Sequence, residues 1–427
     1  MAASFSLATL RKEFHPTFWV ANIMELFERL AYYGQQIVFM VYLRDVLGYS
    51  ESQAGGFSSV FGGVMWLFPI VAGTLADKWG FRRAFMIAFT MLAFGYFLIG
   101  SLGMAMFAGL YGTEQHPVLL MLFLLFTAIG GSFIKPSVLG TVAVTSTEDG
   151  RSLGFAIYYW LVNAGAMIGP TIAFFVRDSF GYEFVYLVSA VSCAAMVVVN
   201  FFMYKEVKPE SGTPVETLAK KFVNLVVVLK NFRFMIFLLI YSLYWIIFWQ
   251  EFIAIPYYVT DYIGKDAPYE IWQSWSGAGA IVLLQIPLNW YTKHWPTHKA
   301  ILVGFAISSL IWVIIGINPS LPTIVAGIIA FAIGEMIQAP RYYEYISAIA
   351  PPGQQGLFQG YGFLPIAIAR FAGDPIGGWV YQTAKANNTP EMIWISLIAI
   401  GALATLLMAL YNKFLLPASH TTGSAQA

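Results

Sequence analysis

The sequence is short of charge. Of its 427 residues, 11% are Asp, Glu, Lys or Arg, whereas 59% are hydrophobic. A soluble domain carries about 25% charged residues, so this chain lacks the polar surface that would keep it in water. The formal net charge is only +1, and no basic stripe extends beyond short loops, which argues against nucleic acid as a partner. The composition predicts a polytopic membrane protein in contact with the lipid bilayer.

Cysteine, histidine and catalytic motifs are also scarce. The single cysteine, Cys193, cannot form an intrachain disulfide. All five histidines fall in predicted loops or tails, and Pro296 between His294 and His298 argues against a helical metal-binding pair. The chain has neither an H-E-x-x-H nor a G-x-S-x-G motif. We therefore expect no enzyme, no catalytic residues, no bound metal and no cofactor.

Long apolar runs are what the sequence has in abundance. A helix needs about 20 apolar residues to cross the hydrocarbon layer. Twelve such runs are separated by turn or charge signals. Their expected limits are 17–44, 52–77, 81–108, 117–143, 150–176, 183–204, 231–262, 268–293, 297–317, 321–348, 353–384 and 389–415. The sequence thus predicts an all-α fold with twelve transmembrane helices.

The basic residues predict the orientation of these spans. With the amino terminus inside, most Lys and Arg fall on cytoplasmic segments. Only Arg44, Arg177, Lys265 and Lys385 then fall on external segments. The positive-inside rule therefore predicts that both termini are cytoplasmic. We expect a multi-pass protein of the plasma membrane, which in bacteria is the inner membrane.

One polar connection divides the chain. Residues 205–230, KEVKPESGTPVETLAKKFVNLVVVLK, form the longest polar stretch between spans. The expected domains are an N-terminal six-helix bundle at 1–204, a cytoplasmic linker at 205–230 and a C-terminal six-helix bundle at 231–427. Two such halves around a central cavity are the repeat architecture of the major facilitator class. We expect the protein to be a monomer.

A short loop between the second and third spans supports this class. The segment GTLADKWGFRRA resembles the G-x-L-A-D-R-x-G-R-R loop motif of that superfamily. Glycine permits close helix approach, the aspartate can sit at a neighbouring helix's positive end, and the arginines can hold the loop at the anionic inner face. An ordinary positive-inside loop is the alternative. The gating motif consists of Gly73, Asp77, Gly80, Arg82 and Arg83.

The stretch ELFERLAYYG places charges inside the first span. Each charge costs roughly 2.5 to 3.5 kcal/mol at the bilayer centre, so these side chains must face the protein interior. Glu25, Glu28, Arg29 and Tyr32 share one helical face, with Tyr33 beside it. A packing salt bridge between Arg29 and one glutamate is the alternative. It leaves the second carboxylate unpaired, and an acid in low dielectric with a movable cation suits a proton carrier.

Other ionisable residues lie at similar depth on later spans. Lys135 falls on the fourth span and Glu335 on the tenth, each more than a turn from the nearest helix end. Lys135 could instead extend its ammonium to the membrane surface. Two further sets of charges are expected to be local pairs, Arg341 with Glu344 and Arg370 with Asp374.

These residues resemble a known family. ELFERLAYYG is similar to the E-x-x-E-R-F-x-Y-Y-G signature of the first helix in the proton-coupled oligopeptide transporters, with Leu30 where that family usually has phenylalanine. GGSFIKPSV, AIYYWLVNAGAMI, WIIFWQ and GEMIQAPRYYEYISAIAPPGQQGLFQGYGFLP resemble its later motifs in the same order. The resemblance covers about residues 15 to 380. The chain is identified as a shorter, twelve-helix relative of this family.

The resemblance implies roles for individual residues. Arg29 and Lys135 would bind a substrate carboxylate, and Glu335 and Asn163 its amino group. In the empty protein Lys135 is a candidate partner for Glu335. The implied proton-coupling residues are Glu25, Glu28, Arg29, Lys135 and Glu335. The expected substrate-binding residues are Arg29, Tyr32, Tyr33, Lys135, Tyr159, Asn163, Trp245 and Glu335, although aromatic residues such as Tyr159 and Trp245 could equally be packing or interfacial residues.

The expected function is proton-coupled symport of short peptides or peptide-like zwitterions by alternating access, with a small-molecule substrate and protons as partners. The alternative is a proton-linked carrier of another solute, or a drug/proton antiporter on the same scaffold. Trp249 stands where the family has a glutamate, and Glu251 lies two residues further on. Whether Glu251 forms an outer gate with Arg44 stays open.

The predicted topology can be tested with single cysteines at Ser211 and Lys265. Ser211 lies in the expected cytoplasmic connection and Lys265 in an expected external loop. A membrane-impermeant thiol reagent added to intact cells should label the cysteine at 265, and the one at 211 only after the cells are opened. Labelling of both from outside would overturn the topology.

Overall fold

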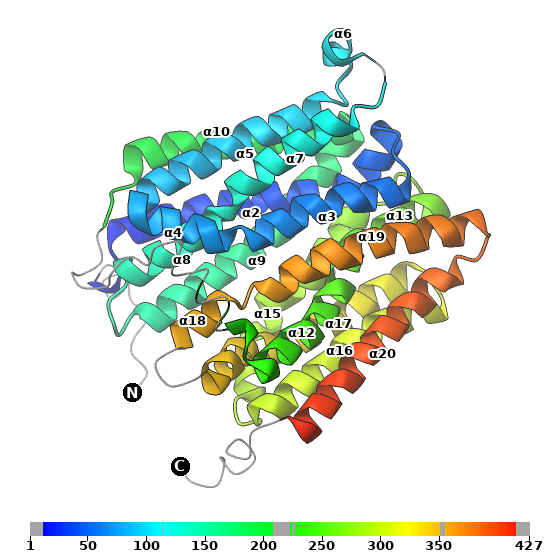
Figure 1. Ribbon diagram of the computed structural model, residues 1–427. Helices are drawn as coiled ribbons and strands as arrows, with labels where there is room; N and C mark the ends of the chain where they lie inside the picture. Colours follow the sequence, from blue (N-terminus) through cyan, green and yellow to red (C-terminus); the bar gives the residue numbers. More distant parts are fainter. Residues whose placement is uncertain are drawn as a thin grey trace. The chain divides into compact units, whose positions relative to one another are not determined.

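Helices form almost all of the structure, a computed structural model that describes residues 12–112, 114–207, 223, 226, 228–350 and 355–415. No β-strand occurs among these residues. The chain divides into two compact units (Figure 1). Unit 1 comprises Met1–Gly48 and Val64–Leu218, and unit 2 comprises Tyr49–Gly63 and Ala219–Ala427.

The helices of unit 1 follow the expected spans closely. They are α2 (Pro16–Val41), η1 (Tyr42–Val46), α4 (Pro69–Trp79), α5 (Phe81–Ser101), η2 (Ala105–Phe107), α6 (Ala108–Tyr111), α7 (Pro117–Ser132), α8 (Ile134–Thr145), α9 (Arg151–Ser179) and α10 (Tyr182–Met203). Helix α3 (Glu51–Leu67) begins in unit 2 and ends in unit 1.

Unit 2 contains more helix breaks. Its helices are α12 (Phe232–Trp249), η3 (Gln250–Phe252), α13 (Ala254–Tyr258), η4 (Val259–Ile263), α14 (Tyr269–Ser274), η5 (Trp275–Gly279), α15 (Ala280–Thr292), α16 (Thr297–Ile317), α17 (Leu321–Ile349), α18 (Gln355–Gly360), α19 (Leu364–Ala386) and α20 (Glu391–Phe414). The π-helical turns η4 and η5 interrupt spans that the sequence predicts as continuous.

Eight helical segments of the described chain are long and apolar enough to cross a membrane. They are Phe81–Ser101, Pro117–Thr145, Arg151–Ser179, Tyr182–Met203, Phe232–Ile263, Thr297–Ile317, Leu321–Ile349 and Glu391–Phe414. The pair α3 and α4, bent by 42°, makes a ninth if it is one span. The chain is therefore an all-α, polytopic membrane protein, and the number twelve stays a prediction. Helix α2 carries three charges, more than a plain lipid-facing span tolerates.

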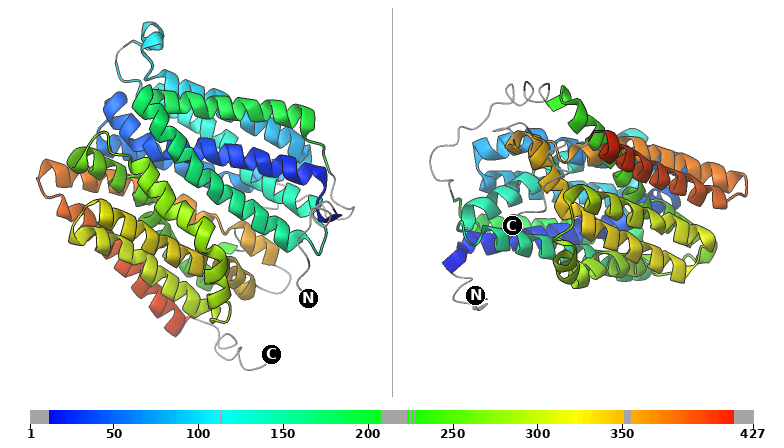
Figure 2. Two further views of the ribbon diagram at one scale, coloured as in Figure 1. Left: turned by 180° about the vertical axis from the view of Figure 1, so that it is seen from behind. Right: turned by 90° about the horizontal axis from the view of Figure 1, so that it is seen from below.

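Close helix packing in unit 1 positions the charged face of α2. Helix α2 packs against α9, α10 and α8, and Figure 2 shows it in dark blue beside the teal α9 and the green α10. A Cβ atom on Gly169 would lie 2.4 Å from the Leu30 carbonyl oxygen, and one on Gly165 would lie 2.6 Å from Arg29 Cβ. Only glycine lets α9 come this close to α2 at the level of Arg29.

One segment of the first half of the chain packs within unit 2. Residues 49–63 lie against α19 there. The linker 205–230 lies mostly outside the described residues, so the two six-helix bundles and the linker between them stay a prediction. Lys205 and Glu206, at the start of that linker, belong to unit 1.

Candidate functional site

Four charged side chains meet inside unit 1. Glu25, Glu28 and Arg29 come from α2 and Lys135 comes from α8. The three α2 residues are 0%, 1% and 4% exposed. Arg29 forms an ion pair with Glu28, and its Nε lies 3.4 Å from Glu25 Oε1. The same Glu25 oxygen lies 2.8 Å from Lys135 Nζ. Two acids on adjacent turns of α2 thus pair with two bases, Arg29 from the same helix and Lys135 from α8.

The cluster is balanced in charge. The sequence-based expectation that an Arg29 salt bridge would leave one carboxylate unpaired is wrong, because Lys135 supplies a second cation. The Lys135 side chain is only 15% exposed, and its ammonium pairs with Glu25 instead of extending away from the cluster. Glu25 Oε2 is buried and has no hydrogen-bond partner among the described residues. One carboxylate oxygen of the cluster is therefore available for a proton.

Aromatic side chains complete the surroundings of both cations. Lys135 Nζ donates a hydrogen bond to the Tyr158 hydroxyl at 2.6 Å, and it also lies 5.1 Å from the centre of that ring. The guanidinium of Arg29 lies 5.0 Å from the ring centre of Tyr32. The hydrogen bond to Tyr158 and the attraction of Arg29 to the Tyr32 ring offset part of the cost of burying the two cations. Sequence analysis missed the role of Tyr158, because Tyr and Trp are common throughout this chain.

A short helix break places Lys135. Helix α7 ends at Ser132 and α8 begins at Ile134, with Phe133 between them. Pro136 lies in the first turn of α8, where a residue without an N–H group costs no helical hydrogen bond. The two helices together are one candidate span, Pro117–Thr145. Lys135 therefore lies in the interior of a membrane-crossing segment, as the sequence predicts.

The other predicted substrate residues of unit 1 lie on α2 and α9, the helices that also carry Tyr32 and Tyr158. The ring of Tyr33 stands edge-on to that of Tyr32 at 5.2 Å. Asn163, on α9, donates a hydrogen bond from Nδ2 to the Tyr159 carbonyl oxygen at 2.9 Å. That bond ties the asparagine to its own helix. The binding roles of these residues stay predictions.

Glu335 and Glu251 of unit 2 have no basic partner among the described residues. Glu335, on α17, has no ion pair or hydrogen bond among the described residues. Glu251, in η3, is 6% exposed, and its Oε1 has no hydrogen-bond partner in the described part of the chain. Within unit 1 the partner of Lys135 is Glu25. The candidate pairing of Lys135 with Glu335 would join the two units and stays a prediction.

Trp245, on α12, belongs to an aromatic group of unit 2. Its ring makes edge contacts with Tyr244 at 5.7 Å and with Phe248 at 5.2 Å. Its indole Nε1 is buried and has no hydrogen-bond partner among the described residues. Packing explains the ring contacts. The indole N–H is a hydrogen-bond donor that the described residues do not use, so it can donate to a ligand as the expected binding role requires.

The two expected local ion pairs are both formed. Arg341 Nη1 lies 2.7 Å from Glu344 Oε2 near the surface of α17. Arg370 Nε lies 3.1 Å from Asp374 Oδ2, and both side chains are 0% exposed. Arg44 pairs with its neighbour Asp45 at 2.6 Å.

The gating loop motif is fixed by a residue that the sequence did not single out. Gly80, with φ of +89°, joins α4 to α5. The N–H groups of Phe81 and Arg82 donate to the Glu206 carboxylate at 2.9 and 2.7 Å, and this acid complements the positive end of α5. Arg82 Nη2 also donates to the Phe201 carbonyl oxygen at 2.6 Å. The loop is thereby tied to the end of α10.

The remaining members of the gating motif lie within α4 and α5. Gly73 and Asp77 lie on α4, and Arg83 lies in the first turn of α5. A Cβ atom on Gly73 would lie 3.4 Å from Pro136 Cβ, so α4 and α8 are in contact there. The expected attraction of the arginines to the inner membrane surface stays a prediction.

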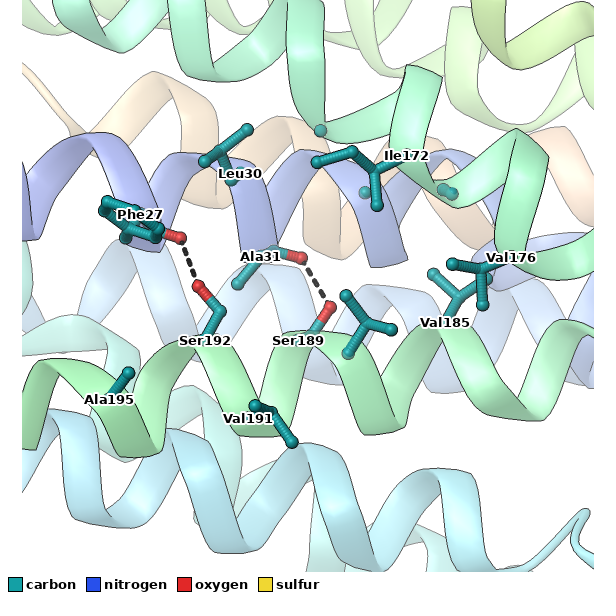
Figure 3. A pocket seen from close by; sticks show the side chains of 14 residues that line it. Phe27, Leu30, Ala31, Ile172, Val176, Val185, Ser189, Val191, Ser192 and Ala195 are labelled. Atoms are coloured by element: carbon teal, nitrogen blue, oxygen red, sulfur yellow. Dashed lines mark hydrogen bonds between the residues drawn. The ribbon is translucent and has the colours of Figure 1, made fainter.

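A cavity of unit 1 lies on the face of α2 opposite the charged one. It has a volume of about 300 Å³ and is lined by apolar residues of α2, α9 and α10 (Figure 3). Ser189 and Ser192 donate hydrogen bonds, each 3.1 Å long, to the carbonyl oxygens of Ala31 and Phe27. At 3.6 residues per turn, this face is about half a turn from the charged one. The cavity therefore contains none of the cluster's charges.

Comparison with known proteins agrees with this architecture. A sequence model described as Major Facilitator Superfamily matches residues 23–283. The multidrug resistance protein MdtH of Photorhabdus laumondii subsp. laumondii is 25% identical over 346 residues, covering 81% of each chain.

Solved structures show the same fold at lower identity. A POT family transporter in complex with 5-aminolevulinic acid is 17% identical with a TM-score of 0.73, over 93% of this chain and 95% of that one. The nucleoside transporter NupG is 13% identical with a TM-score of 0.74, over 92% of this chain and 99% of that one. At these identities the likeness concerns the fold.

The ion cluster makes a prediction about stability. Lys135→Met removes the nearest cation from buried Glu25. Breaking a buried pair costs roughly 3 to 5 kcal/mol, and we expect the lower end because Arg29 remains 3.4 Å from Glu25. The double variant Lys135→Met/Glu25→Gln should recover most of the loss, since no acid is left without its partner. Thermal unfolding of the purified protein in detergent measures both.

The matched control is the exposed pair on α17. Glu344→Gln breaks an ion pair of similar length, but the Glu344 side chain is 50% exposed and water replaces the lost partner. We expect a loss of about 1 kcal/mol or less. An equal loss for Lys135→Met and Glu344→Gln would mean that the cluster is not desolvated.

Proposed function

Because the chain belongs to the Major Facilitator Superfamily, we propose that it is a proton-coupled carrier that moves a small zwitterion, such as a short peptide or a peptide-like compound, by alternating access. The observation that supports this proposal best is the buried cluster of Glu25, Glu28, Arg29 and Lys135. Four charges in a membrane-crossing bundle are costly, and a transporter is the kind of protein in which they have a use.

The charge balance of the cluster suggests how a proton and a substrate are coupled. When Glu25 or Glu28 takes up a proton, a buried cation is left without its acid. A buried charge without a partner is unfavourable, so the freed Arg29 or Lys135 attracts an anionic group. A substrate carboxylate supplies that group and restores neutrality. Proton and substrate then favour each other's binding, which is the requirement for symport.

The energy source is the proton gradient. Moving one proton inward across the membrane releases about 2.3 kcal/mol per 100 mV. We propose the bacterial inner membrane as the location, with both termini in the cytoplasm and a monomer as the working unit. Glu25 and Glu28, the two acids of the cluster, are the candidates to accept the proton.

The ammonium group of the zwitterion would be received by unit 2. Glu335 and Glu251 lack a basic partner among the described residues. A ligand ammonium would supply the missing cation. That one substrate reaches both Arg29 and Glu335 is a prediction from the sequence. The proposed partners are therefore protons and a molecule with a carboxylate at one end and an amine at the other.

A second candidate function is drug/proton antiport. MdtH, similar over 81% of this chain, is named a multidrug resistance protein. Glu251 and Glu335 could also receive a lipophilic cation that has no carboxylate. The two functions differ in one requirement, because a drug cation does not need Arg29 or Lys135 as an anion receptor. Ligand charge therefore separates the two functions.

Coupling can be tested by neutralising the cluster. Glu28→Gln and Lys135→Ala should lose pH-driven uptake into liposomes, because the proton site or its cation is gone. Counterflow exchange, which needs no net proton movement, should remain in part. Glu344→Gln, which breaks a surface pair, should keep the pH-driven uptake of the wild type. Unchanged proton-driven rates in both cluster variants would reduce these charges to packing elements.

Substrate class can be tested with ligands of defined charge. A dipeptide, its N-acetylated form and its amide are compared by binding to the wild type and to Glu335→Gln. A ligand that lacks one charge leaves a buried protein group unpaired, at a cost of about 1 to 3 kcal/mol, so the wild type should bind it roughly tenfold more weakly or worse. In Glu335→Gln the acetylated form should lose little relative to the free dipeptide.

Two outcomes would reject the zwitterion proposal. The first is equal binding of the acetylated and free dipeptides to the wild type. The second is binding of lipophilic cations, but of no peptide, with Glu251 and Glu335 both required. The second outcome would favour the antiporter.

A further inference from the structure

A second buried ion pair lies where α3 meets α19. The first half of α3, Tyr49–Gly63, packs along α19 within unit 2. Glycines make the approach possible, since a Cβ on Gly55 would lie 2.6 Å from the Asp374 carbonyl oxygen. A Cβ on Gly62 would lie 1.9 Å from Arg370 Nε. The backbone of α3 is thus pressed against a charged stretch of α19.

Ser58 of α3 bridges both members of this pair. Its hydroxyl donates to Asp374 Oδ2 at 2.8 Å and accepts from Arg370 Nη2 at 3.0 Å. Arg370 Nη2 also lies 3.3 Å from the Ser58 carbonyl oxygen. Arg370 and Asp374 are both 0% exposed. The pair therefore holds α3 through hydrogen bonds that exist only while the two helices touch.

The surroundings of the pair are otherwise neutral. Helix α12 contributes Trp249, whose ring centre lies 4.2 Å from Arg370 Cζ. The following turn, η3, contributes Gln250, which donates to the Gly373 carbonyl oxygen at 2.9 Å. From α3 comes Ser58, and Arg370 is the one charged group that faces Asp374 among the described residues. Asp374 Oδ1 and Arg370 Nη1 are buried without a hydrogen-bond partner there.

A second ionic contact joins the same helices at the start of α3. Lys385 of α19 lies 3.2 Å from Glu51 Oε1 of α3 and 2.8 Å from Asp261 Oδ2 of η4. Its side chain is 43% exposed, so water screens this contact. Because this surface contact is weak, the buried pair of Arg370 and Asp374 is the stronger of the two ionic contacts that hold α3 to α19.

We propose that Asp374 is a second proton-binding site, separate from the Glu25 cluster, and that its protonation releases the first half of α3 from α19. A proton on Asp374 neutralises the acid and leaves Arg370 as an unbalanced buried cation. Ser58 and Trp249 offer it only a dipole and a ring face. Water can reach the guanidinium if α3 moves away from α19, which relieves the cost of the unpaired charge.

The position of α3 in the chain gives this release a consequence. Helix α3 continues past Gly63 into residues of unit 1, so release from α19 moves the first half of a helix that the two units share. A carrier that works by alternating access rearranges helix contacts of this kind. In this respect the inference rests on the proposed function, whereas the protonation of Asp374 itself can be measured without substrate.

A cysteine pair reports the contact directly. Ser52 on α3 and Gln382 on α19 touch, because the Ser52 N–H donates to Gln382 Oε1 at 3.1 Å. Ser52→Cys and Gln382→Cys are combined with Cys193→Ala to remove the native thiol. Disulfide formation in the purified protein is followed from about pH 8 to about pH 5, without substrate or proton gradient. The same pair in an Asp374→Asn background is measured at each pH, so that the pH dependence of thiol chemistry cancels in the ratio.

The expected result is a ratio that changes with pH. At about pH 8 the protein with Asp374 should cross-link roughly tenfold faster than Asp374→Asn, and at about pH 5 the two rates should converge. The double variant Arg370→Gln/Asp374→Asn removes both charges, so it should cross-link fast at every pH. This variant also serves if Asp374→Asn alone does not fold, because wild type and double variant should then diverge as the pH falls.

A ratio that is constant with pH would overturn the inference and leave the pair as a permanent packing element. Ser58→Ala separates the bridge from the proton site. Ser58→Ala should slow cross-linking at high pH. The ratio of the rates with Asp374 and with Asp374→Asn, measured in the Ser58→Ala background, should still change with pH. Because no substrate is present, failure here leaves the proposed transport function intact. Conversely, failure of the uptake tests would leave the behaviour of Asp374 unaffected.

Discussion

The cost of an unpaired charge in a membrane-crossing bundle governs this structure. A polar surface cannot relieve it, because lipid surrounds such a bundle, so each buried charge needs a partner on its own or a neighbouring helix. Glu28 finds Arg29 one residue away, whereas Glu25 depends on Lys135 from a different helix. Helix α8 therefore has to lie against α2 in unit 1. The ion cluster fixes the packing of these helices as much as their apolar contacts do.

Glycine makes that pairing geometrically possible. At Gly165 and Gly169 helix α9 approaches α2 so closely that any side chain would meet backbone or Cβ atoms. This approach brings Tyr158 of α9 within hydrogen-bond distance of Lys135. The same device recurs in unit 2, where Gly55 and Gly62 let α3 approach α19. Charges at the two contacts are thus held by helices that only small residues allow to meet.

The acids of the two units differ in whether they have basic partners. In unit 1 acids and bases are equal in number within the cluster, so a proton taken up there creates a free cation. In unit 2, Glu251 and Glu335 have no basic partner among the described residues, whereas Asp374 is paired with Arg370. Acids without a partner suit a cationic ligand group, and paired acids suit a proton that breaks the pair. The two arrangements are what the proposed proton-coupled transport would require of this chain.

The sequence alone determined the class of protein, most helix positions and the depth of the key charges. Hydrophobic length and the cost of charge in lipid act locally, so the all-α membrane fold and the shared face of Glu25, Glu28 and Arg29 could be predicted from spacing. Partners between distant segments could not. That Lys135 pairs with Glu25, that Tyr158 joins it, that Glu206 caps α5 and that Ser58 bridges Arg370 and Asp374 were decided by the tertiary structure. Each of these contacts depends on which helices pack together and in what register, and helical periodicity within one segment contains no information about that choice.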